Sequence, residues 1–176
     1  MVIWINGCFG VGKTTTAKLL EQKIGNARIY DPEIFGSLLW AFFPKSVKET
    51  GDFQDLILWR RFTYTVIRFL SGCCRGHILV PMTLVNPQYY DEIIGALRRD
   101  GVIVRHFILT ASKEDILSRL RRRGEVQDSW AERQLARCLD AFAGAIPGEK
   151  INTEQIPAEQ AAAQICSALF PATGGE

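Results

Sequence analysis

One segment near the start of the chain restricts its fold more than any other. Residues 7–14 read GCFGVGKT and fit the pattern G-x-x-x-x-G-K-[ST]. The segment follows an apolar run at residues 2–5 and precedes a stretch in which Ala17, Leu20 and Ile24 recur at helical spacing. A glycine-rich turn between a strand and a helix directs backbone amides and the positive end of the helix dipole to one point. We therefore predict a phosphate-binding loop at residues 7–14.

Each residue type in this loop suits the binding of a nucleoside triphosphate. The glycines let the chain curl without Cβ clashes, so that successive amides face one phosphate group. Lys13 is expected to neutralise oxygens of the β- and γ-phosphates, and the Thr14 hydroxyl to be a ligand of Mg²⁺. We therefore predict binding of ATP, or of another purine nucleoside triphosphate, with Mg²⁺. The residues expected to contact the nucleotide are Gly7, Phe9, Gly10, Val11, Gly12, Lys13, Thr14 and Thr15.

Short apolar runs and longer helical stretches alternate along the rest of the chain. Candidates for four further strands lie at residues 28–30, 77–80, 102–109 and 150–151. Signals for helix starts occur at Asp31-Pro32, Asn86-Pro87, Ser112 and Ser129, and a long helix is expected at about residues 54–72. This alternation argues for a parallel sheet with helices on both of its faces. We predict an α/β fold with a five-stranded, doubly wound parallel sheet.

The length of the chain, 176 residues, suits one domain with a substantial core. No internal repeat or low-complexity linker divides it. We expect a single domain over residues 1–170 and a disordered tail over residues 171–176, which contain Pro171, Gly174 and Gly175.

Charge and hydropathy argue against several classes of partner. The net charge of +2 is too small to indicate a nucleic-acid or membrane-surface partner. No apolar stretch approaches the roughly 20 residues that a membrane-spanning helix needs, and no secretory signal opens the chain. The five cysteines are odd in number and lack the spacing of a zinc site, so we expect reduced thiols and a cytoplasmic protein. The sequence leaves the oligomeric state open.

Several further segments stand out along the chain: WINGCFGVGKT at residues 4–14, YDPE at 30–33 with Gly36, VPMTLVNP at 80–87, DEII at 91–94 and RGE at 123–125. Together they resemble the bacterial tunicamycin-resistance ATP-binding proteins. The resemblance covers most of the chain. It implies a P-loop NTPase fold related to chloramphenicol phosphotransferase and the nucleotide kinases, and a role in resistance to a nucleoside antibiotic. It leaves open whether the drug is phosphorylated or only bound.

The third predicted strand departs from the wider pattern of P-loop enzymes. Many of them end this strand with an acidic residue that supports Mg²⁺, whereas residues 77–82, HILVPM, contain none. The D-x-D spacing of shikimate kinases after the second strand is also absent, because Pro32 and Glu33 follow Asp31. A carboxylate near the metal must therefore come from elsewhere, and Asp31 is the first candidate.

Asp31 is expected at the carboxyl end of the second strand, where ligands of open α/β sheets gather. An acid there would accept or orient the proton of an attacking hydroxyl, or support the metal. Asp before Pro is also a good helix N-cap, which needs no catalytic role. Glu33 is a weaker candidate for acceptor binding because acids favour first helical turns in any case. Thr83 faces the same end of the sheet and is a further candidate for contact with the acceptor.

Three arginines share one helical face by their spacing: Arg119, Arg122 and Arg123. We expect a short lid near residues 123–128, with Arg119 and Arg123 neutralising charge on the phosphoryl group during transfer. The alternative is a solvated basic face.

Arg61 and Arg68 lie in a helix that is otherwise rich in aromatic residues. Charges amid so much apolar surface need a partner. An anionic or uridine-like substrate is one such partner, and a structural carboxylate such as Asp55 or Glu49 is another. His77 and His106 are expected to be structural.

Three functional hypotheses follow. The first is an ATP-dependent phosphotransferase that acts on a small-molecule acceptor, a hydroxyl of a nucleoside or antibiotic. The second is a nucleotide-gated protein that sequesters its ligand without chemistry, which the missing acid after the third strand would fit. The third is a metabolic nucleoside or nucleotide kinase.

Overall fold

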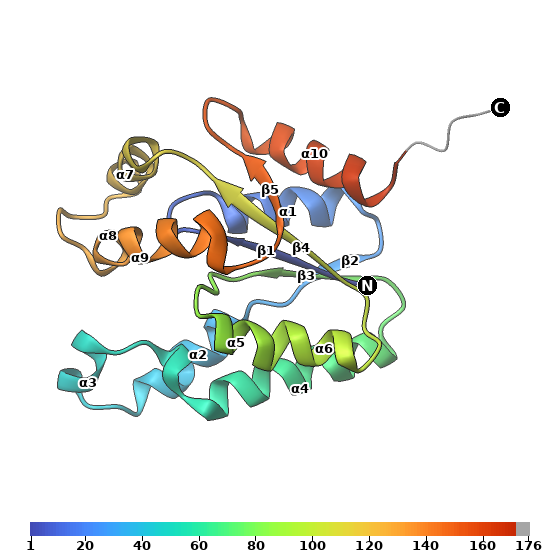
Figure 1. Ribbon diagram of the computed structural model, residues 1–176, viewed down its shortest axis with the longest axis horizontal. Helices are drawn as coiled ribbons and strands as arrows, with labels where there is room; N and C mark the ends of the chain where they lie inside the picture. Colours follow the sequence, from blue (N-terminus) through green and yellow to red (C-terminus); the bar gives the residue numbers. More distant parts are fainter. Residues whose placement is uncertain (172–176) are drawn as a thin grey trace.

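Five parallel strands form one sheet in the computed structural model, which describes residues 1–171 apart from the side chains of residues 49 and 50 (Figure 1). The strands are β1 (Val2–Gly7), β2 (Ala27–Ile29), β3 (His77–Pro81), β4 (Val104–Thr110) and β5 (Glu149–Asn152). Their order across the sheet is β2-β3-β1-β4-β5, and all four neighbouring pairs are parallel. The predicted five-stranded parallel sheet is therefore confirmed.

Helices cover both faces of this sheet (Figure 1). Those longer than five residues are α1 (Lys13–Lys23), α2 (Pro32–Ala41), α3 (Lys45–Thr50), α4 (Ile57–Cys73), α7 (Lys113–Arg122), α9 (Leu135–Asp140) and α10 (Ala158–Leu169). Shorter ones are the 3₁₀ turn η1 (Phe53–Asp55), α5 (Pro87–Tyr90), α6 (Ala96–Arg99), α8 (Trp130–Arg133) and the π-helical segments η2 (Asp91–Gly95) and η3 (Ala141–Ala145). The helices α1 and α10 pack on one face, whereas α4, α5 and α6 lie on the other (Figure 1).

The two faces of β1 supply two separate cores. Val2 and Trp4 belong to the core under α4 and α5, and Ile3 and Ile5 belong to the core under α1 and α10. This alternation is the two-residue period of a strand whose two faces are both covered. β1 is buried along its whole length and lies in the middle of the sheet, so the loop that follows it starts from a rigid support.

Most predicted helix starts are confirmed by their caps. The side chains of Asp31, Asn86, Ser112 and Ser129 each accept a hydrogen bond from a backbone amide in the first turn of the following helix. The helix expected at about residues 54–72 is displaced, because η1 precedes α4 as a separate turn. No prediction had been made for α3, and the predicted tail lies outside the described residues apart from Pro171. In the described part of the chain, no helix combines the length and apolarity needed to cross a bilayer.

Candidate active site

The loop between β1 and α1 is shaped to hold an anion. Gly10 and Gly12 have φ values of 83° and 108°, a left-handed region that favours glycine. A Cβ on Gly10 would also lie 2.9 Å from the side chain of Leu120, so α7 packs directly on the loop. Gly12 is the N-cap of α1 and provides no side-chain cap, so the first amides of α1 lack a side-chain acceptor. These amides and the helix dipole suit a phosphate group.

Lys13 closes this loop from within. Its side chain is only 8% exposed, and its Nζ donates to the backbone oxygens of Gly7 at 3.1 Å and Cys8 at 3.0 Å. Burial lowers the pKa of the Lys13 ammonium, while the negative charge of Glu33 opposes that shift. A partly desolvated cation at this point gains from an anionic ligand.

A cavity of about 830 Å³ surrounds the loop and opens beside α7 and α10. Seven of the eight predicted nucleotide contacts line it, namely Phe9, Gly10, Val11, Gly12, Lys13, Thr14 and Thr15, and Gly7 lies beneath the loop. The loop sits at the carboxyl end of β1, which lies between β3 and β4. The chain passes from β1 to β2 on one side of β1 and from β3 to β4 on the other, and ligands of open α/β sheets gather at such a switch point. The geometry therefore brings the predicted loop residues around one space, and their contact with a nucleotide stays a prediction.

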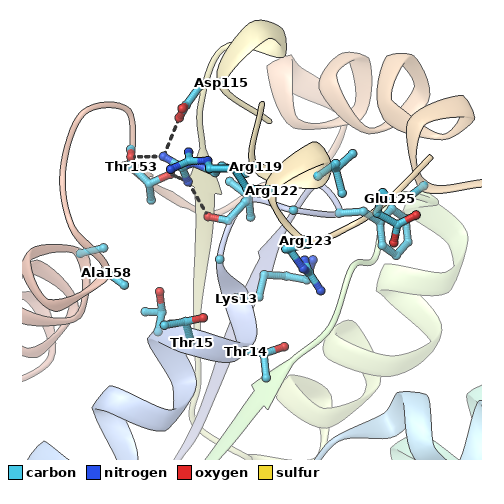
Figure 2. Close-up of a pocket in the computed structure, with 18 of the residues that line it drawn as sticks. Lys13, Thr14, Thr15, Asp115, Arg119, Arg122, Arg123, Glu125, Thr153 and Ala158 are labelled. Atoms are coloured by element: carbon cyan, nitrogen blue, oxygen red, sulfur yellow. Dashed lines mark hydrogen bonds and ion pairs between the residues drawn. The ribbon is translucent and has the colours of Figure 1, made fainter. Parts of the chain in front are cut away.

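Arg119 lines this cavity but has other partners than those predicted. Its guanidinium donates to the oxygens of Val11 at 3.0 Å and Thr153 at 2.6 Å, and it forms an ion pair with Asp115 at 2.5 Å. Figure 2 shows it turned toward Thr153. It thus links α7, the phosphate loop and the loop after β5, and its charge is already shared with Asp115. These contacts favour a positioning role for Arg119, and its direct role on the transferring phosphoryl group stays a prediction.

Arg123 is the arginine that faces the phosphate loop. It is the C-cap of α7, and Figure 2 shows its guanidinium directed toward Lys13 and Thr14. Its charge acts on the pKa values of both Lys13 and Glu33, which places it near both groups. Arg122 also lines the cavity.

The residues expected to form a lid, 123–128, make the turn from α7 to α8. Arg121 donates to the Val126 oxygen at 2.9 Å and pairs with Glu132 at 2.6 Å. Glu132 in turn accepts from the Asp128 amide at 2.7 Å. The turn is therefore held from both sides while Arg123 and Glu125 face the cavity.

The two acidic residues after β2 differ in position. Asp31 caps α2, and its Oδ1 accepts from the Glu33 amide at 2.9 Å. Glu33, one half-turn further on, lines the cavity together with Lys13. Burial raises the pKa of the Glu33 carboxyl, and Lys13 opposes this shift. Helix α2 thus turns Glu33, and not Asp31, toward the phosphate loop, and the predicted roles of both acids stay predictions.

Three further predicted contacts are placed elsewhere. Thr83 is buried and donates to the Gly7 oxygen at 2.9 Å, so it supports the loop from below. Arg68 pairs with Asp100 at 3.2 Å near the carboxyl end of α4. Arg61 is exposed, and neither Arg61 nor Arg68 lines the cavity. The alternative of a structural carboxylate is confirmed for Arg68, although the partner is Asp100 and not Asp55 or Glu49.

The residues around the cavity fit a nucleotide with Mg²⁺. The uncapped amides of α1, the buried Lys13 ammonium and Arg123 provide the positive field that a triphosphate needs. Among the described residues, no group of three or more His, Cys, Asp or Glu side chains is placed to hold a metal. Mg²⁺ at a triphosphate keeps several waters and is also bound by the phosphates, so one or two protein ligands are enough to hold it. Thr14 is exposed at the first turn of α1 and is the candidate ligand.

Comparison with known proteins identifies the family of this chain. The family model described as an AAA domain matches residues 2–145. The tunicamycin resistance protein of Deinococcus radiodurans superposes with a TM-score of 0.78 at 30% sequence identity, over 96% of this chain and 94% of that one. The chain belongs to the AAA-domain family of tunicamycin-resistance-like P-loop proteins. Proteins of this P-loop class typically bind a nucleotide with Mg²⁺.

Other solved structures share the fold of this tunicamycin-resistance-like protein. A sugar kinase from Janibacter sp. HTCC2649 matches with a TM-score of 0.68 at 18% identity, over 97% of this chain and 95% of that one. A shikimate kinase from Acinetobacter baumannii matches with a TM-score of 0.65 at 18% identity, over 99% and 95%. At such identities the likeness shows the kinase fold alone. A search of curated proteins finds no match.

The sequence of this tunicamycin-resistance-like protein did not predict three charged residues that form or contact the turn η1 and its N-cap. Arg60, next to Arg61, is the arginine of α4 that is buried, and Asp52 pairs with Arg137 across 85 positions of the sequence. Helical spacing carried one usable signal, since Trp59, Thr63 and Ile67 form the buried face of α4 and Arg60 borders it. No pattern of neighbouring residues in the sequence indicates the pairing of Asp52 with Arg137.

Proposed function

We propose that this chain is an ATP-dependent phosphotransferase that acts on a hydroxyl group of a small, nucleoside-like acceptor. The observation that carries the proposal is the position of Glu33, a carboxylate that lines the same cavity as the phosphate loop and lies near Lys13 and Arg123. A base beside a cationic phosphate site is the arrangement that phosphoryl transfer to a hydroxyl requires.

Each residue around the cavity has its own role in this reaction. The loop amides and Lys13 hold the phosphates, and Thr14 is the ligand for Mg²⁺, which supplies charge neutralisation at the phosphate oxygens. Glu33 accepts the proton of the acceptor hydroxyl. The hydroxyl oxygen bonds to the γ-phosphorus of ATP, while the bond between that phosphorus and ADP breaks and ADP leaves. Its raised pKa, caused mainly by burial, makes it a stronger base than an exposed glutamate. Asp31 holds the first turn of α2 and thereby positions Glu33.

Arg123 neutralises charge on the transferred group, because it is the arginine directed at Lys13 and Thr14 (Figure 2). Arg119 has a positioning role, since its contacts join the phosphate loop to the loop after β5. The resistance function of the relative suggests a nucleoside antibiotic as the acceptor, and tunicamycin is the first compound to test.

The experiment incubates the protein with Mg-ATP and tunicamycin, or with a panel of nucleosides, and follows the acceptor by mass spectrometry. Transfer adds one phosphoryl group, about 80 Da. Glu33→Gln should retain ATP binding but lower kcat by about 10²- to 10⁴-fold, since it removes the base. Glu114→Gln, an exposed change on α7, is the matched control and should leave turnover intact. Full turnover by Glu33→Gln would refute the assigned base.

A second candidate is a nucleotide-gated binding protein that sequesters its ligand. It is favoured by the end of β3, where Thr83 donates to the Gly7 oxygen and no acid follows the strand. Tight, ATP-dependent retention of tunicamycin without a mass gain would favour it. The nucleoside panel also separates an antibiotic-directed enzyme from a metabolic nucleoside or nucleotide kinase.

A further inference from the structure

Helix α7 ends against the phosphate loop. Arg119 donates to the Val11 oxygen at 3.0 Å. A Cβ on Gly10 would lie 2.9 Å from the Leu120 side chain, so this leucine packs on the neighbouring residue of the loop. The arginine that faces the phosphate loop, Arg123, caps the same helix (Figure 2). These two contacts fix the chain on the amino-terminal side of Arg123.

Trp130, the first residue of α8, contacts the phosphate loop on the other side of Arg123. Its ring meets the Phe9 ring edge to face, with 4.9 Å between the ring centroids and 69° between the ring planes. Phe9 belongs to the phosphate loop, and the Nζ atom of Lys13 lies 5.2 Å from the centroid of its ring. One aromatic ring therefore contacts both the cation of the loop and the helix that follows the turn.

Hydrogen bonds join the turn that carries Arg123 to α8. Arg133 of α8 donates to the Asp128 oxygen at 2.5 Å. The Asp128 amide donates to the Glu132 carboxylate at 2.7 Å, and the Ser129 hydroxyl accepts from the Glu132 amide at 3.4 Å. Because these bonds connect the turn to α8, a displacement of α8 would also move Arg123.

The contact between Trp130 and Phe9 controls how two cations lie relative to each other, an inference that rests on the proposed function. Arg123 stabilises a γ-phosphate only if its guanidinium stays close to the group that Lys13 holds, since charge-assisted hydrogen bonds depend on distance and angle. Trp130 packs on the ring beside Lys13 and begins the helix that is joined to the turn of Arg123. We propose that Trp130 is a positioning residue, which holds Arg123 against the γ-phosphate through its contact with Phe9.

The experiment measures by calorimetry the affinity of each variant for Mg-ADP and for the Mg²⁺ complex of a non-hydrolysable ATP analogue. The ratio of the two dissociation constants isolates the γ-phosphate, and a loss of stability alone leaves it unchanged because both ligands need the folded chain. Trp130→Leu should lower the preference for the triphosphate about tenfold, the effect of one hydrogen bond to a charged group. Phe9→Leu breaks the same ring contact from the loop side and should cause at least the same loss. Trp130→Phe keeps an aromatic ring at this position and should retain the preference.

A double variant shows whether Trp130 acts through Arg123. Arg123→Gln should lower the preference for the triphosphate by a similar factor, because it removes the charge itself. In the Arg123→Gln background, Trp130→Leu should have no further effect, since the group that it positions is already gone. Two independent losses would multiply to about a hundredfold. That result would overturn the proposal, because Trp130 would then act on the nucleotide without Arg123.

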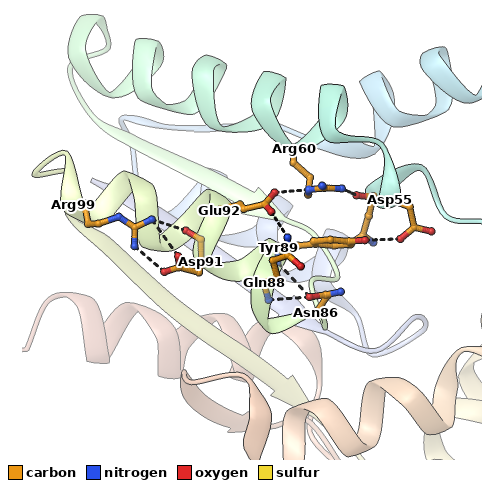
Figure 3. Close-up of polar contacts among 9 residues, drawn as sticks. Asp55, Arg60, Asn86, Gln88, Tyr89, Asp91, Glu92 and Arg99 are labelled. Carbon is orange, nitrogen blue, oxygen red and sulfur yellow. Dashed lines mark hydrogen bonds and ion pairs between the residues drawn. The ribbon is translucent and has the colours of Figure 1, made fainter.

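Two other aromatic contacts provide matched controls. Trp40 packs on Phe43 with 5.2 Å between the ring centroids. Tyr89 lies against the Arg60 guanidinium, whose Cζ atom is 4.2 Å from the ring centroid (Figure 3). None of these four residues lines the cavity. Trp40→Leu and Tyr89→Leu should therefore keep the full preference for the triphosphate.

Three further results would overturn the proposal. A wild type that binds both nucleotides equally would have no γ-phosphate contact to position. An unchanged ratio in both Trp130→Leu and Phe9→Leu would show that the ring contact does not place Arg123. An equal loss in the two control variants would show that the effect is not specific to this contact. Failure of the proposed phosphoryl transfer is distinguishable, because it would appear as the absence of a mass gain on the acceptor while these binding ratios hold.

Discussion

Asn6, the residue before the phosphate loop, uses both ends of its buried amide. Its Oδ1 accepts from the amides of Gly7 and Leu84, each at 2.9 Å. Its Nδ2 donates to the Leu84 oxygen at 2.9 Å and to Nε2 of His106 at 3.2 Å. Because Nε2 accepts, the proton of a neutral His106 must lie on Nδ1, which donates to the Pro147 oxygen at 2.6 Å. The expected structural role of His106 agrees with these contacts.

The neutral state of His106 makes the stability of the folded chain depend on pH. Burial lowers the pKa of His106 to about 4 from its usual 6.5, and the bond to Pro147 only partly opposes this. The unfolded chain therefore binds more protons at this residue, so its contribution to stability is complete above pH 6.5 and declines as the pH falls toward 4. The loss should reach about 3 kcal/mol by pH 4.

The measurement is urea unfolding between pH 7 and pH 4 for the wild type and His106→Gln. The glutamine cannot titrate, so the difference between the two proteins isolates the histidine from the carboxyl groups. A difference that stays constant over this range would contradict the assigned neutral state of His106.

At the scale of elements, the phosphate loop is supported by neighbours on several sides. Thr83, after β3, donates to the Gly7 oxygen from one side, and Arg119 of α7 donates to the Val11 oxygen from another. The loop geometry thus depends on elements that are far from it in the sequence.

Thr83→Val tests this support. The valine fills the same buried space but cannot donate to the Gly7 oxygen, which then has Lys13 as its remaining side-chain donor among the described residues. We expect a loss of about 1–2 kcal/mol in the free energy of unfolding and weaker nucleotide binding. Thr83→Ser retains the hydroxyl and should bind nucleotide as the wild type does. Equal nucleotide affinity in the valine and serine variants would exclude a role for this hydrogen bond.

At the scale of the whole molecule, the cavity joins parts of the chain that are distant in sequence. The phosphate loop, the start of α2, the end of α7 and the loop after β5 all line it. A ligand that contacts all of them binds only the folded chain. Nucleotide binding and global stability are therefore linked.

Mg-ATP at about 100 times its Kd should raise the free energy of unfolding by about 2.7 kcal/mol. Lys13→Ala should abolish this gain, because it removes the cation at the centre of the loop. Lys18→Ala, an exposed change on the same helix, should preserve it. The measurement is thermal unfolding with and without Mg-ATP. An equal shift in Lys13→Ala would mean that the nucleotide binds somewhere other than this loop.

The sequence by itself determined the phosphate loop, the five strands and most of the helix caps. These features arise from chemistry within a few residues, such as glycines that allow a left-handed turn, an aspartate before proline, and apolar runs of strand length. That is also why the boundaries of β2 and β3 agree with the predicted ones to within one residue.

Only the tertiary structure decided which polar side chains face the cavity. Asp31 and Glu33 are two residues apart, and the direction of α2 alone places the glutamate beside Lys13. Arg119 donates to the Thr153 oxygen, since packing of α7 brings the loop after β5 within reach. The pairing of Asp52 with Arg137 spans 85 positions. Partners of this kind are set by how helices pack across the sheet, which no local pattern encodes.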